Sequence, residues 1–208
     1  MKVWAIVLAA GSGARYGGPK HELQLGGLPL WKRSVSVLEA SGIDSVVVVG
    51  PVDGGVPGGP RRRDSVVAGL AAVPESVEWV VIHDAARPLI TRRLVATVLG
   101  AARSGQSDAV VPALAVTDTL KVVDGDVVVE TIDRSQLAAV QTPQAFRAKL
   151  LREAHLIDPD DDVTDDAGLL ERIGGTVTIV PGDRTNIKIT FAGDLELAEQ
   201  MMGVMRDD

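Results

Sequence analysis

The feature that most constrains this chain is an alternation between short apolar runs and segments of helical periodicity. The runs have the length of strands, and they are apolar at nearly every position, as strands buried on both faces of a sheet are. They span residues 3–10, 45–49, 77–83 and 109–112. Strands that alternate with helices form a parallel sheet covered on both sides. The sequence therefore predicts a doubly wound, mostly parallel α/β fold.

Helices are predicted between these strands and again after them. Residues 29–41 place Trp31, Val35 and Leu38 on one face and end at Gly42, which is typical of a helix stop. Asp64 and Thr91 are predicted to cap the next two helices. The helices capped by Asp64 and Thr91 are expected at 64–73 and 91–105. Further helices are expected at 142–154, 164–174 and, as an amphipathic segment, 194–205. Further strands are expected at 177–180 and 186–189.

Two segments interrupt this alternation. Residues 50–60 are rich in glycine and proline and are predicted to form a loop. Residues 118–123 and 126–132 flank Asp124-Gly125, which is a strong hairpin signal. Because a two-stranded ribbon is marginally stable alone, the hairpin is expected to pack on another surface. We expect one domain over residues 1–208, with an arm inserted at about 117–134.

Composition excludes several classes of function. The chain has 208 residues, a net charge of −7 and no cysteine. The negative charge argues against a nucleic-acid partner, and the missing cysteine excludes disulfides and thiolate metal sites. Lys2 and the apolar run after it are compatible with a signal peptide, but the glycines that follow favour a buried strand. No apolar run is long enough to cross a membrane, so we expect a cytoplasmic protein.

A glycine-rich segment follows the first predicted strand. Gly11-Ser12-Gly13 precedes two cations, Arg15 and Lys20. Backbone N–H groups of such a turn can surround phosphate oxygens. The segment is not a Walker A loop, because Pro19 stands where that motif needs its lysine, and it lacks the third glycine of a dinucleotide-binding fingerprint. The alternative is a flexible loop with two solvated cations.

Three polar segments follow strands and are predicted to meet at one edge of the sheet. They span residues 9–20, 83–87 and 185–188. Open α/β sheets bind ligands beyond the carboxyl ends of their strands. The sequence therefore predicts a ligand site at that edge, with cations supplied by the first and third segments.

These segments, together with others, resemble one family. The motifs are Leu8-Ala9-Ala10-Gly11-x-Gly13-x-Arg15 with Pro19-Lys20, Arg62-x-Asp64-Ser65-Val66, His83-Asp84-Ala85-Ala86-Arg87-Pro88, Thr117-Asp118-Thr119-Leu120-Lys121, Gln141-Thr142-Pro143-Gln144, Thr164-Asp165-Asp166 and Asn186-Ile187-Lys188-Ile189-Thr190. In this order, from about residue 3 to residue 200, they are similar to 2-C-methyl-D-erythritol 4-phosphate cytidylyltransferases. The resemblance implies a Rossmann-like nucleotidyltransferase fold and transfer of CMP from CTP to a sugar-alcohol phosphate.

The resemblance also implies roles for individual residues. Arg15 and Lys20 are expected to stabilise the transition state, and Arg134 and Lys188 to hold the incoming phosphate. The nucleotide is expected to contact Ala9, Ala10, Gly11, Ser12, Gly13, Arg62, Ser65 and Asp84. The acceptor is expected to contact Asp84, Arg87, Thr119, Arg134, Thr142, Thr164 and Lys188. Asp84 is the expected ligand of Mg²⁺. In the family the arm exchanges between subunits, which implies a homodimer whose sites share Thr119 and Arg134.

The chain departs from the family pattern at two places near the expected nucleotide site. His21 follows Lys20 where glutamine is usual, and residues 50–60 are shorter than expected. The run Arg61-Arg62-Arg63 leaves open which arginine faces the nucleotide.

Other functions remain as alternatives. A ribitol 5-phosphate cytidylyltransferase would have the same fold and chemistry, but Ala85-Ala86 favours the methylerythritol acceptor. A non-catalytic nucleotide-binding module is expected to lack one of the cations. A dehydrogenase is disfavoured by the missing third glycine.

Overall fold

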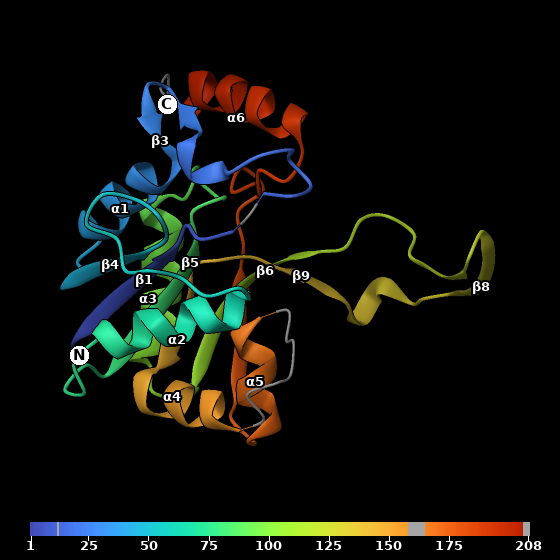
Figure 1. Cartoon of the computed structure of the whole chain (residues 1–208). Helices are drawn as coiled ribbons and strands as arrows, with labels where there is room; N and C mark the ends of the chain where they lie inside the picture. The colour runs from blue at the N-terminus through green and yellow to red at the C-terminus, as the bar shows by residue number, and fades with distance from the viewer. Residues whose placement is uncertain (12, 158–164, 206–208) are drawn as a thin grey trace.

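The computed structural model describes residues 1–11, 13–157 and 165–205, and these form a seven-stranded central sheet (Figure 1). Its order is β11 (Val177–Pro181), β6 (Ala109–Ala115), β10 (Gln144–Arg147), β5 (Trp79–Asp84), β1 (Val3–Leu8) and β4 (Ser45–Val49), with β9 (Ala138–Val140) paired to β6. The pairs β1–β4, β1–β5 and β6–β11 are parallel, whereas β10 runs antiparallel between β5 and β6. The prediction of a mostly parallel sheet is confirmed, and the fold is a Rossmann-like α/β fold.

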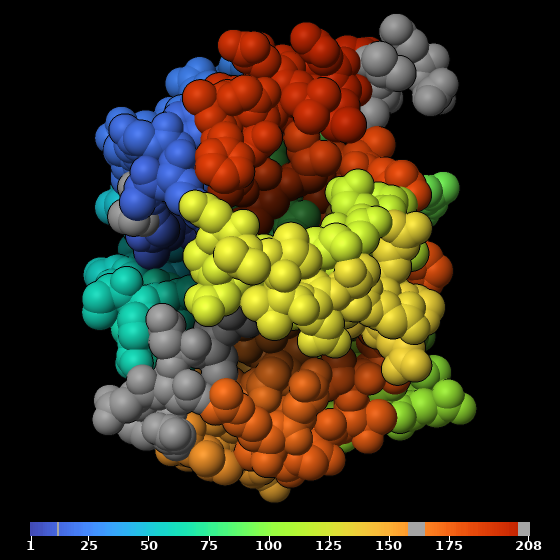
Figure 2. All heavy atoms as spheres, turned by 90° about the vertical axis from the view of Figure 1, so that its right-hand side faces the viewer, coloured from blue at the N-terminus to red at the C-terminus, as the bar shows by residue number. Residues whose placement is uncertain are grey.

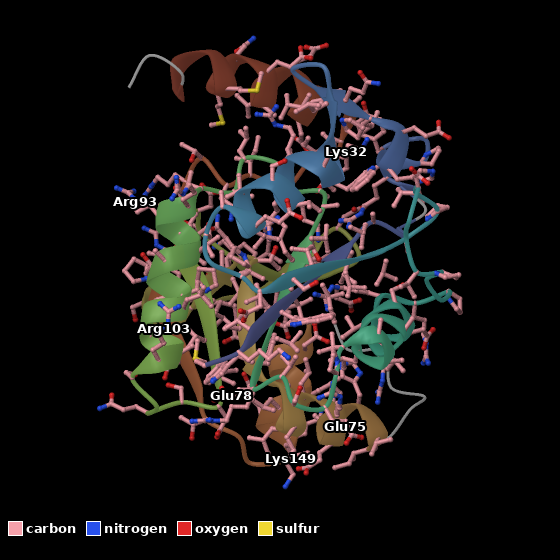
Figure 3. The ribbon with its side chains drawn as sticks, turned by 90° about the vertical axis from the view of Figure 1, so that its left-hand side faces the viewer. Lys32, Glu75, Glu78, Arg93, Arg103 and Lys149 are labelled. Atoms are coloured by element: carbon pink, nitrogen blue, oxygen red, sulfur yellow. The ribbon has the colours of Figure 1, made fainter. Side chains whose placement is uncertain are left out.

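Helices cover both faces of the sheet. On one face α1 (Leu30–Glu39) and α3 (Arg92–Arg103) bury Leu38 and Leu99 against Val7. On the other face lie α2 (Arg62–Ala72), α4 (Ala148–Leu156) and α5 (Asp166–Arg172), and Leu151 packs in a cluster with Ile6. Successive residues of β1 thus point into different clusters, as the period of a strand requires. Figure 3 shows α3 and α2 on opposite sides of the sheet, with Arg93 and Arg103 on the outer side of α3.

A third cluster lies at one end of the molecule, under α6 (Ala192–Met205). The predicted helix is confirmed, and Leu195, Ala198, Met201 and Met202 pack into this cluster, whereas Leu197 is exposed, so the helix is less amphipathic than expected. They pack near the small sheet formed by β2 (Gln24–Leu25) and β3 (Leu28–Pro29). Tyr16 and Leu23 pack against this cluster, and they flank the segment η1 (Lys20–Glu22), which carries the lysine of the glycine-rich loop.

The predicted hairpin is present and projects from the body as an arm (Figure 1). Strand β7 (Lys121–Asp124) pairs antiparallel with β8 (Val127–Thr131), so the turn is Gly125-Asp126, one residue later than expected. A short segment η2 (Arg134–Gln136) follows. Figure 2 views the arm end on, between α6 above and α5 below. The valines of β8 are more than half exposed, so in this single chain the arm offers an uncovered apolar surface.

One predicted helix starts too early, and one predicted strand is wrong. The helix expected at 142–154 begins only at Ala148, as α4, because residues 144–147 form β10, which fills the space between β5 and β6 through antiparallel hydrogen bonds. Residues 186–189 are not a strand; their backbone runs as an irregular segment across the carboxyl ends of the sheet, where Ile189 N–H bonds to Ala86 O. Strand β4 is only half-buried except at Val49, because it lies at the edge of the sheet.

The expected helix caps are partly confirmed. Thr91 accepts a hydrogen bond from Leu94 N–H, as a capping threonine should. Asp64 is not the cap of α2: Arg61 occupies that position, and the Asp64 carboxylate accepts from the Arg61 N–H three residues back. Thr164, the expected cap of the next helix, lies outside the described residues, and Asp165 caps α5. None of the described helices is both long and apolar enough to cross a bilayer.

Candidate functional site

A cavity of about 560 Å³ lies beyond the carboxyl ends of β1 and β5. Its walls come from the glycine-rich loop, η1, the start of α1, the start of α2, the end of β5 and the irregular segment before α6. The lining residues are Leu8, Ala9, Ala10, Gly11, Gly13, Ala14, Arg15, Lys20, His21, Leu30, Trp31, Gly59, Pro60, Arg61, Arg62, Ser65, Asp84, Ala85, Ala86 and Lys188. The predicted convergence of three segments at this edge of the sheet is therefore confirmed.

The glycine-rich loop turns sharply at Gly13. This residue has a φ of +68°, and a Cβ there would lie 1.9 Å from the carbonyl oxygen of Gly18. Tyr16 and Gly17 donate their N–H groups to Gly13 O, so the loop closes on itself before it reaches Lys20. Only glycine fits this geometry without strain. Ser12, predicted at the nucleotide site, lies outside the described residues.

Cations dominate the cavity wall although the chain as a whole is anionic. Lys20 donates from Nζ to Ile189 O at 2.8 Å, which ties the glycine-rich loop to the segment carrying Lys188. Burial, together with the nearby charges of Lys188 and Arg15, lowers the pKa of Lys20 below its ordinary value. The three cations therefore repel one another in this pocket, and an anionic ligand would relieve that repulsion.

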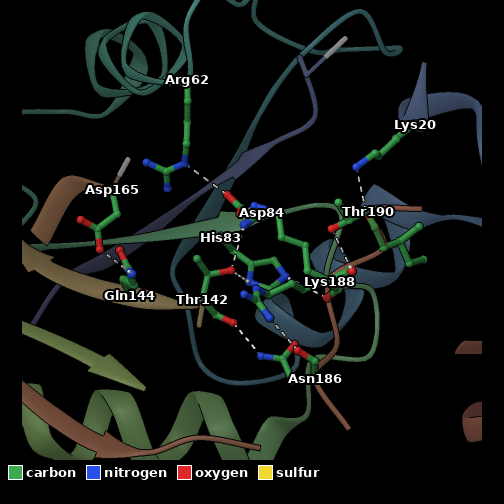
Figure 4. A network of polar contacts seen from close by, with 12 residues as sticks. Lys20, Arg62, His83, Asp84, Thr142, Gln144, Asp165, Asn186, Lys188 and Thr190 are labelled. Atoms are coloured by element: carbon green, nitrogen blue, oxygen red, sulfur yellow. Dashed lines mark hydrogen bonds and ion pairs between the residues drawn. The ribbon is translucent and has the colours of Figure 1, made fainter. Parts of the chain in front are cut away.

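Asp84 ends β5 and is held between two cations (Figure 4). Lys188 Nζ lies 2.7 Å from Asp84 Oδ2, and Arg62 Nε lies 3.4 Å from Oδ1. Burial acts to raise the pKa of Asp84, but the charges of Arg62 and Lys188 outweigh it and hold that pKa well below its ordinary value. Asp84 is therefore an ionised carboxylate at the cavity wall.

One ionised carboxylate fits a particular kind of metal site. Among the described residues, no group of three or more acidic or histidine side chains is arranged to hold a metal by itself. Mg²⁺ commonly binds one or two carboxylates together with the phosphates of a substrate. Asp84 suits that arrangement, in which the ion would arrive with a triphosphate.

A buried hydrogen-bond network supports Asp84 from behind (Figure 4). His83 Nε2 lies 3.2 Å from Arg87 O, and since a carbonyl only accepts, Nε2 carries the hydrogen. His83 Nδ1 then accepts from the Thr142 hydroxyl at 3.1 Å, while the Asp84 N–H donates to Thr142 Oγ1. Asn186 Nδ2 donates to Thr142 O. Burial lowers the pKa of His83 to about 4, so this histidine is neutral at pH 7.

Several predicted acceptor-binding residues lie beside the cavity and do not line it. Arg87 donates from one terminal nitrogen to Asn186 O, and Thr142 is buried within the network of His83. Thr119 and Arg134 lie on the exposed arm, where Arg134 donates to Thr117 O. Thr164 lies outside the described residues. Within one chain, the structure brings together Lys20, Lys188 and Asp84 but not the arm residues, whose roles stay predictions.

The structure separates the three consecutive arginines. Arg61 and Arg62 line the cavity, together with Ser65. Arg63 is buried and points toward α4, where it donates to the carbonyl oxygens of His155 and Ile157. Arg62 is the arginine that reaches Asp84.

Four residues in or beside this site were not predicted from the sequence to belong to it. Leu30 and Trp31, read only as parts of a helix, form an apolar wall of the cavity. His155, expected to meet a helix dipole, is instead buried and donates from Nε2 to Asp166 Oδ1 at 3.0 Å. Asp166 in turn binds Arg62 at 2.7 Å. Asp166 follows the cap Asp165, and because an acidic residue is ordinary in the first turn of a helix, no local signal indicated its contact with Arg62.

Comparison with known proteins places the chain beside one enzyme family. The family model described as 2-C-methyl-D-erythritol 4-phosphate cytidylyltransferase matches residues 3–204. A protein of that name from Nocardia farcinica is 44% identical over 96% of this chain and 94% of its own length. The bifunctional enzyme IspD/IspF of Solidesulfovibrio magneticus is 45% identical, and this chain covers 57% of its length. The crystal structure of the cytidylyltransferase from Thermus thermophilus superposes with a TM-score of 0.82 at 37% identity, covering 97% of this chain and 98% of that one.

Proposed function

The chain belongs to the 2-C-methyl-D-erythritol 4-phosphate cytidylyltransferase family, and we propose that it transfers the CMP unit of CTP to 2-C-methyl-D-erythritol 4-phosphate. The products are 4-diphosphocytidyl-2-C-methyl-D-erythritol and pyrophosphate. The observation that carries this proposal is the convergence of Arg15, Lys20 and Lys188 around one cavity at the carboxyl ends of β1 and β5. The chain spans just over half the length of the bifunctional relatives it matches, so the proposal concerns this chain's own activity.

The cavity suits attack by one anion on another. A phosphate monoester is mostly dianionic at pH 7, because its second pKa is about 6, so it needs no general base. Its oxygen forms a bond to the α-phosphorus of CTP as the bond to the pyrophosphate oxygen breaks. Negative charge then grows on the α-phosphate and the leaving group, and Arg15 and Lys20 would stabilise it there. Lys188 would hold the incoming phosphate in line.

The nucleotide is expected to enter with its phosphates against the glycine-rich loop. Gly11 and Gly13 would offer backbone N–H groups to the phosphates, as glycine turns after strands do. The backbone at Ala9 and Ala10 and the side chain of Ser65, which line the same cavity, would contact the nucleoside. Gly58 supports this arrangement, because its missing side chain leaves space beside Ala10. A Cβ at this position would lie 2.4 Å from the Cβ of Ala10 and fill that space.

We further propose that Asp84 contributes a ligand to Mg²⁺ bound with CTP. The ion would neutralise charge on the triphosphate and so allow a second anion to approach. Asp84 is suited to the role because it is ionised and lies at the cavity wall. Its present partners, Lys188 and Arg62, would shift toward the phosphates that they are proposed to bind.

A homodimer with shared sites is proposed on the strength of the arm. The exposed valines at 122, 123 and 127–129 form an apolar surface on a ribbon that packs against nothing in this chain's described residues. Such a ribbon gains stability by packing on another surface. A partner that receives the arm would also receive Thr119 and Arg134, which are two of the predicted acceptor-binding residues that do not line this chain's cavity.

Mixing two inactive variants tests the shared site. Arg134→Ala and Lys20→Ala are each expected to be inactive alone. If sites form across the interface, a mixed dimer has one site with both lesions and one with neither, so equal mixing with subunit exchange restores about a quarter of the sites. If each subunit builds its own site, every site keeps a lesion and the mixture stays inactive, which would refute the shared site.

The acceptor is tested by pyrophosphate release. With CTP fixed, the protein is expected to turn over 2-C-methyl-D-erythritol 4-phosphate far faster than ribitol 5-phosphate, and CTP faster than the other nucleoside triphosphates. The reverse preference would replace the proposed acceptor and leave the chemistry intact. Binding of CTP without turnover of either acceptor would identify a non-catalytic module. We also propose that the chain forms a single nucleotidyltransferase domain and that it acts in the cytoplasm.

A further inference from the structure

We propose that Asp166, supported by His155, is a positioning residue that holds Arg62 at the nucleotide cavity and limits its pairing with Asp84. The proposal rests on the function proposed above, because it concerns how CTP is bound. It adds two residues from α4 and α5, neither of which lines the cavity, to the set that controls the site.

Arg62 bridges two carboxylates that come from different elements. Its Nε lies 3.4 Å from Asp84 Oδ1, and one terminal nitrogen lies 2.7 Å from Asp166 Oδ2. The shorter contact is the stronger one, since charge-assisted hydrogen bonds of this kind are about 2.7–2.9 Å long. Arg62 is therefore anchored at Asp166 and only loosely paired with Asp84.

The position of Arg62 in its helix is unfavourable for a cation. It is the first residue of α2, where the helix dipole disfavours positive charge. Something other than helix stability must therefore account for an arginine here. The side chain is 26% exposed and forms part of the cavity wall, and the guanidinium carries five N–H donors, more than its two carboxylate contacts use. It is suited to bind an anionic part of the nucleotide.

Asp166 is built as a fixed anchor. Its side chain is 1% exposed, and it is the first residue of α5, where the helix dipole favours a negative charge. The second carboxylate oxygen accepts a hydrogen bond from His155 Nε2 at 3.0 Å, and the His155 side chain is 3% exposed. Burial opposes ionisation, but the hydrogen bond from His155 and the charge of Arg62 still lower the pKa of Asp166. Both oxygens thus have a partner, and the carboxylate cannot turn away from Arg62 without losing one.

Asp84 and Asp166 compete for the guanidinium of Arg62, and this competition explains why the contact between Asp166 and Arg62 matters. Among the described residues, Asp84 is the other carboxylate that contacts Arg62, so without the charge of Asp166 these two side chains would draw together into a closer pair. That pair would withdraw Arg62 from the nucleotide and neutralise Asp84. The variant Asp166→Asn keeps the size and shape of the side chain and removes this charge.

The test is the affinity for CTP, measured by calorimetry with Mg²⁺ present and no acceptor. Asp166→Asn is expected to raise the Kd for CTP by roughly tenfold or more. This is the change expected when Arg62 loses one charge-assisted contact with the nucleotide. In an Arg62→Gln background the same substitution is expected to change the Kd by less than about twofold, because two residues that act through one another are not additive. Equal effects in both backgrounds would overturn the proposal.

A matched control separates positioning from general support of α5. Asp165→Asn alters the neighbouring carboxylate, which caps α5 through Gly168 N–H and does not contact Arg62, so it is expected to leave the Kd for CTP unchanged. If Asp166→Asn lowers the melting temperature but leaves the Kd at the wild-type value, its role is structural and the proposal fails. If Asp166→Asn does not fold, His155→Gln decides, with an expected rise of roughly threefold in Kd; an unchanged Kd would refute the idea. Wild-type protein that fails to bind CTP would instead contradict the proposed function.

Discussion

Acidification should destabilise the fold through His83, and the size of the effect follows from its burial. Burial lowers the pKa of His83 from an ordinary value of 6.5 to about 4. Below pH 6.5 the unfolded chain binds a proton at this histidine, whereas the folded chain does so only near pH 4. Stability is therefore lost as the pH falls through this window. At about 1.36 kcal/mol per pKa unit, the loss is about 3 kcal/mol across the window.

The two buried carboxylates of the site do not obscure this window. The pKa values of Asp84 and Asp166 are lowered from 3.8, so the stability that these groups contribute is present above that pH and is lost only below it. His83→Gln removes the titrating group while the amide can still donate to Arg87 O and accept from Thr142. The variant is thus expected to be less dependent on pH between 6.5 and 4.5, whatever its stability at pH 7.

The assay is urea unfolding at fixed protein concentration, followed by circular dichroism at several pH values from 7 to 4.5. The wild-type free energy of unfolding is expected to fall by about 1.4 kcal/mol per pH unit more steeply than that of His83→Gln. Parallel curves for the two proteins would refute the reasoning, because they would show that His83 is not buried as a neutral imidazole.

Two further predictions concern catalysis. Lys20→Ala and Arg15→Ala are each expected to lower kcat by roughly a hundredfold or more with CTP affinity changed far less, whereas the exposed Lys149→Ala should match the wild type; losses below about tenfold would contradict the roles of the first two residues. Chelation with EDTA is expected to abolish turnover and added Mg²⁺ to restore it, and Asp84→Asn should require more Mg²⁺ for half-maximal rate; full activity in the chelator would refute the metal assignment.

The sheet and most of the site were predictable because their signals are local. The run before Gly11 is apolar along its whole length, so β1 and the loop after it follow from patterning and from the need for a residue such as Gly13 at positive φ. Thr91 could be predicted as a helix cap because its contact with Leu94, three residues later, is also local. The motifs then assigned Lys20, Asp84 and Lys188 to one edge of the sheet, and the cavity wall contains all three.

The errors lie where long-range contacts decide the structure. Residues 144–147 form a strand because β5 and β6 leave room for an antiparallel neighbour. The sequence of those four residues does not indicate this strand. Asp166 and His155 are 11 positions apart, and Arg62 lies 104 positions from Asp166. Charges that far apart in sequence carry no periodic signal. The choice among the three arginines likewise depended on the direction in which α2 leaves the loop.

The most direct test of the central claim is a ³¹P NMR time course with CTP, 2-C-methyl-D-erythritol 4-phosphate and Mg²⁺. We expect the CTP and acceptor resonances to decline together, while an unsymmetrical diphosphate and pyrophosphate appear in equal amounts. We expect Lys20→Ala to abolish both products and Lys149→Ala to leave both unchanged. Release of inorganic phosphate with CDP, or the absence of any diphosphate product from the wild-type protein, would contradict the proposed reaction.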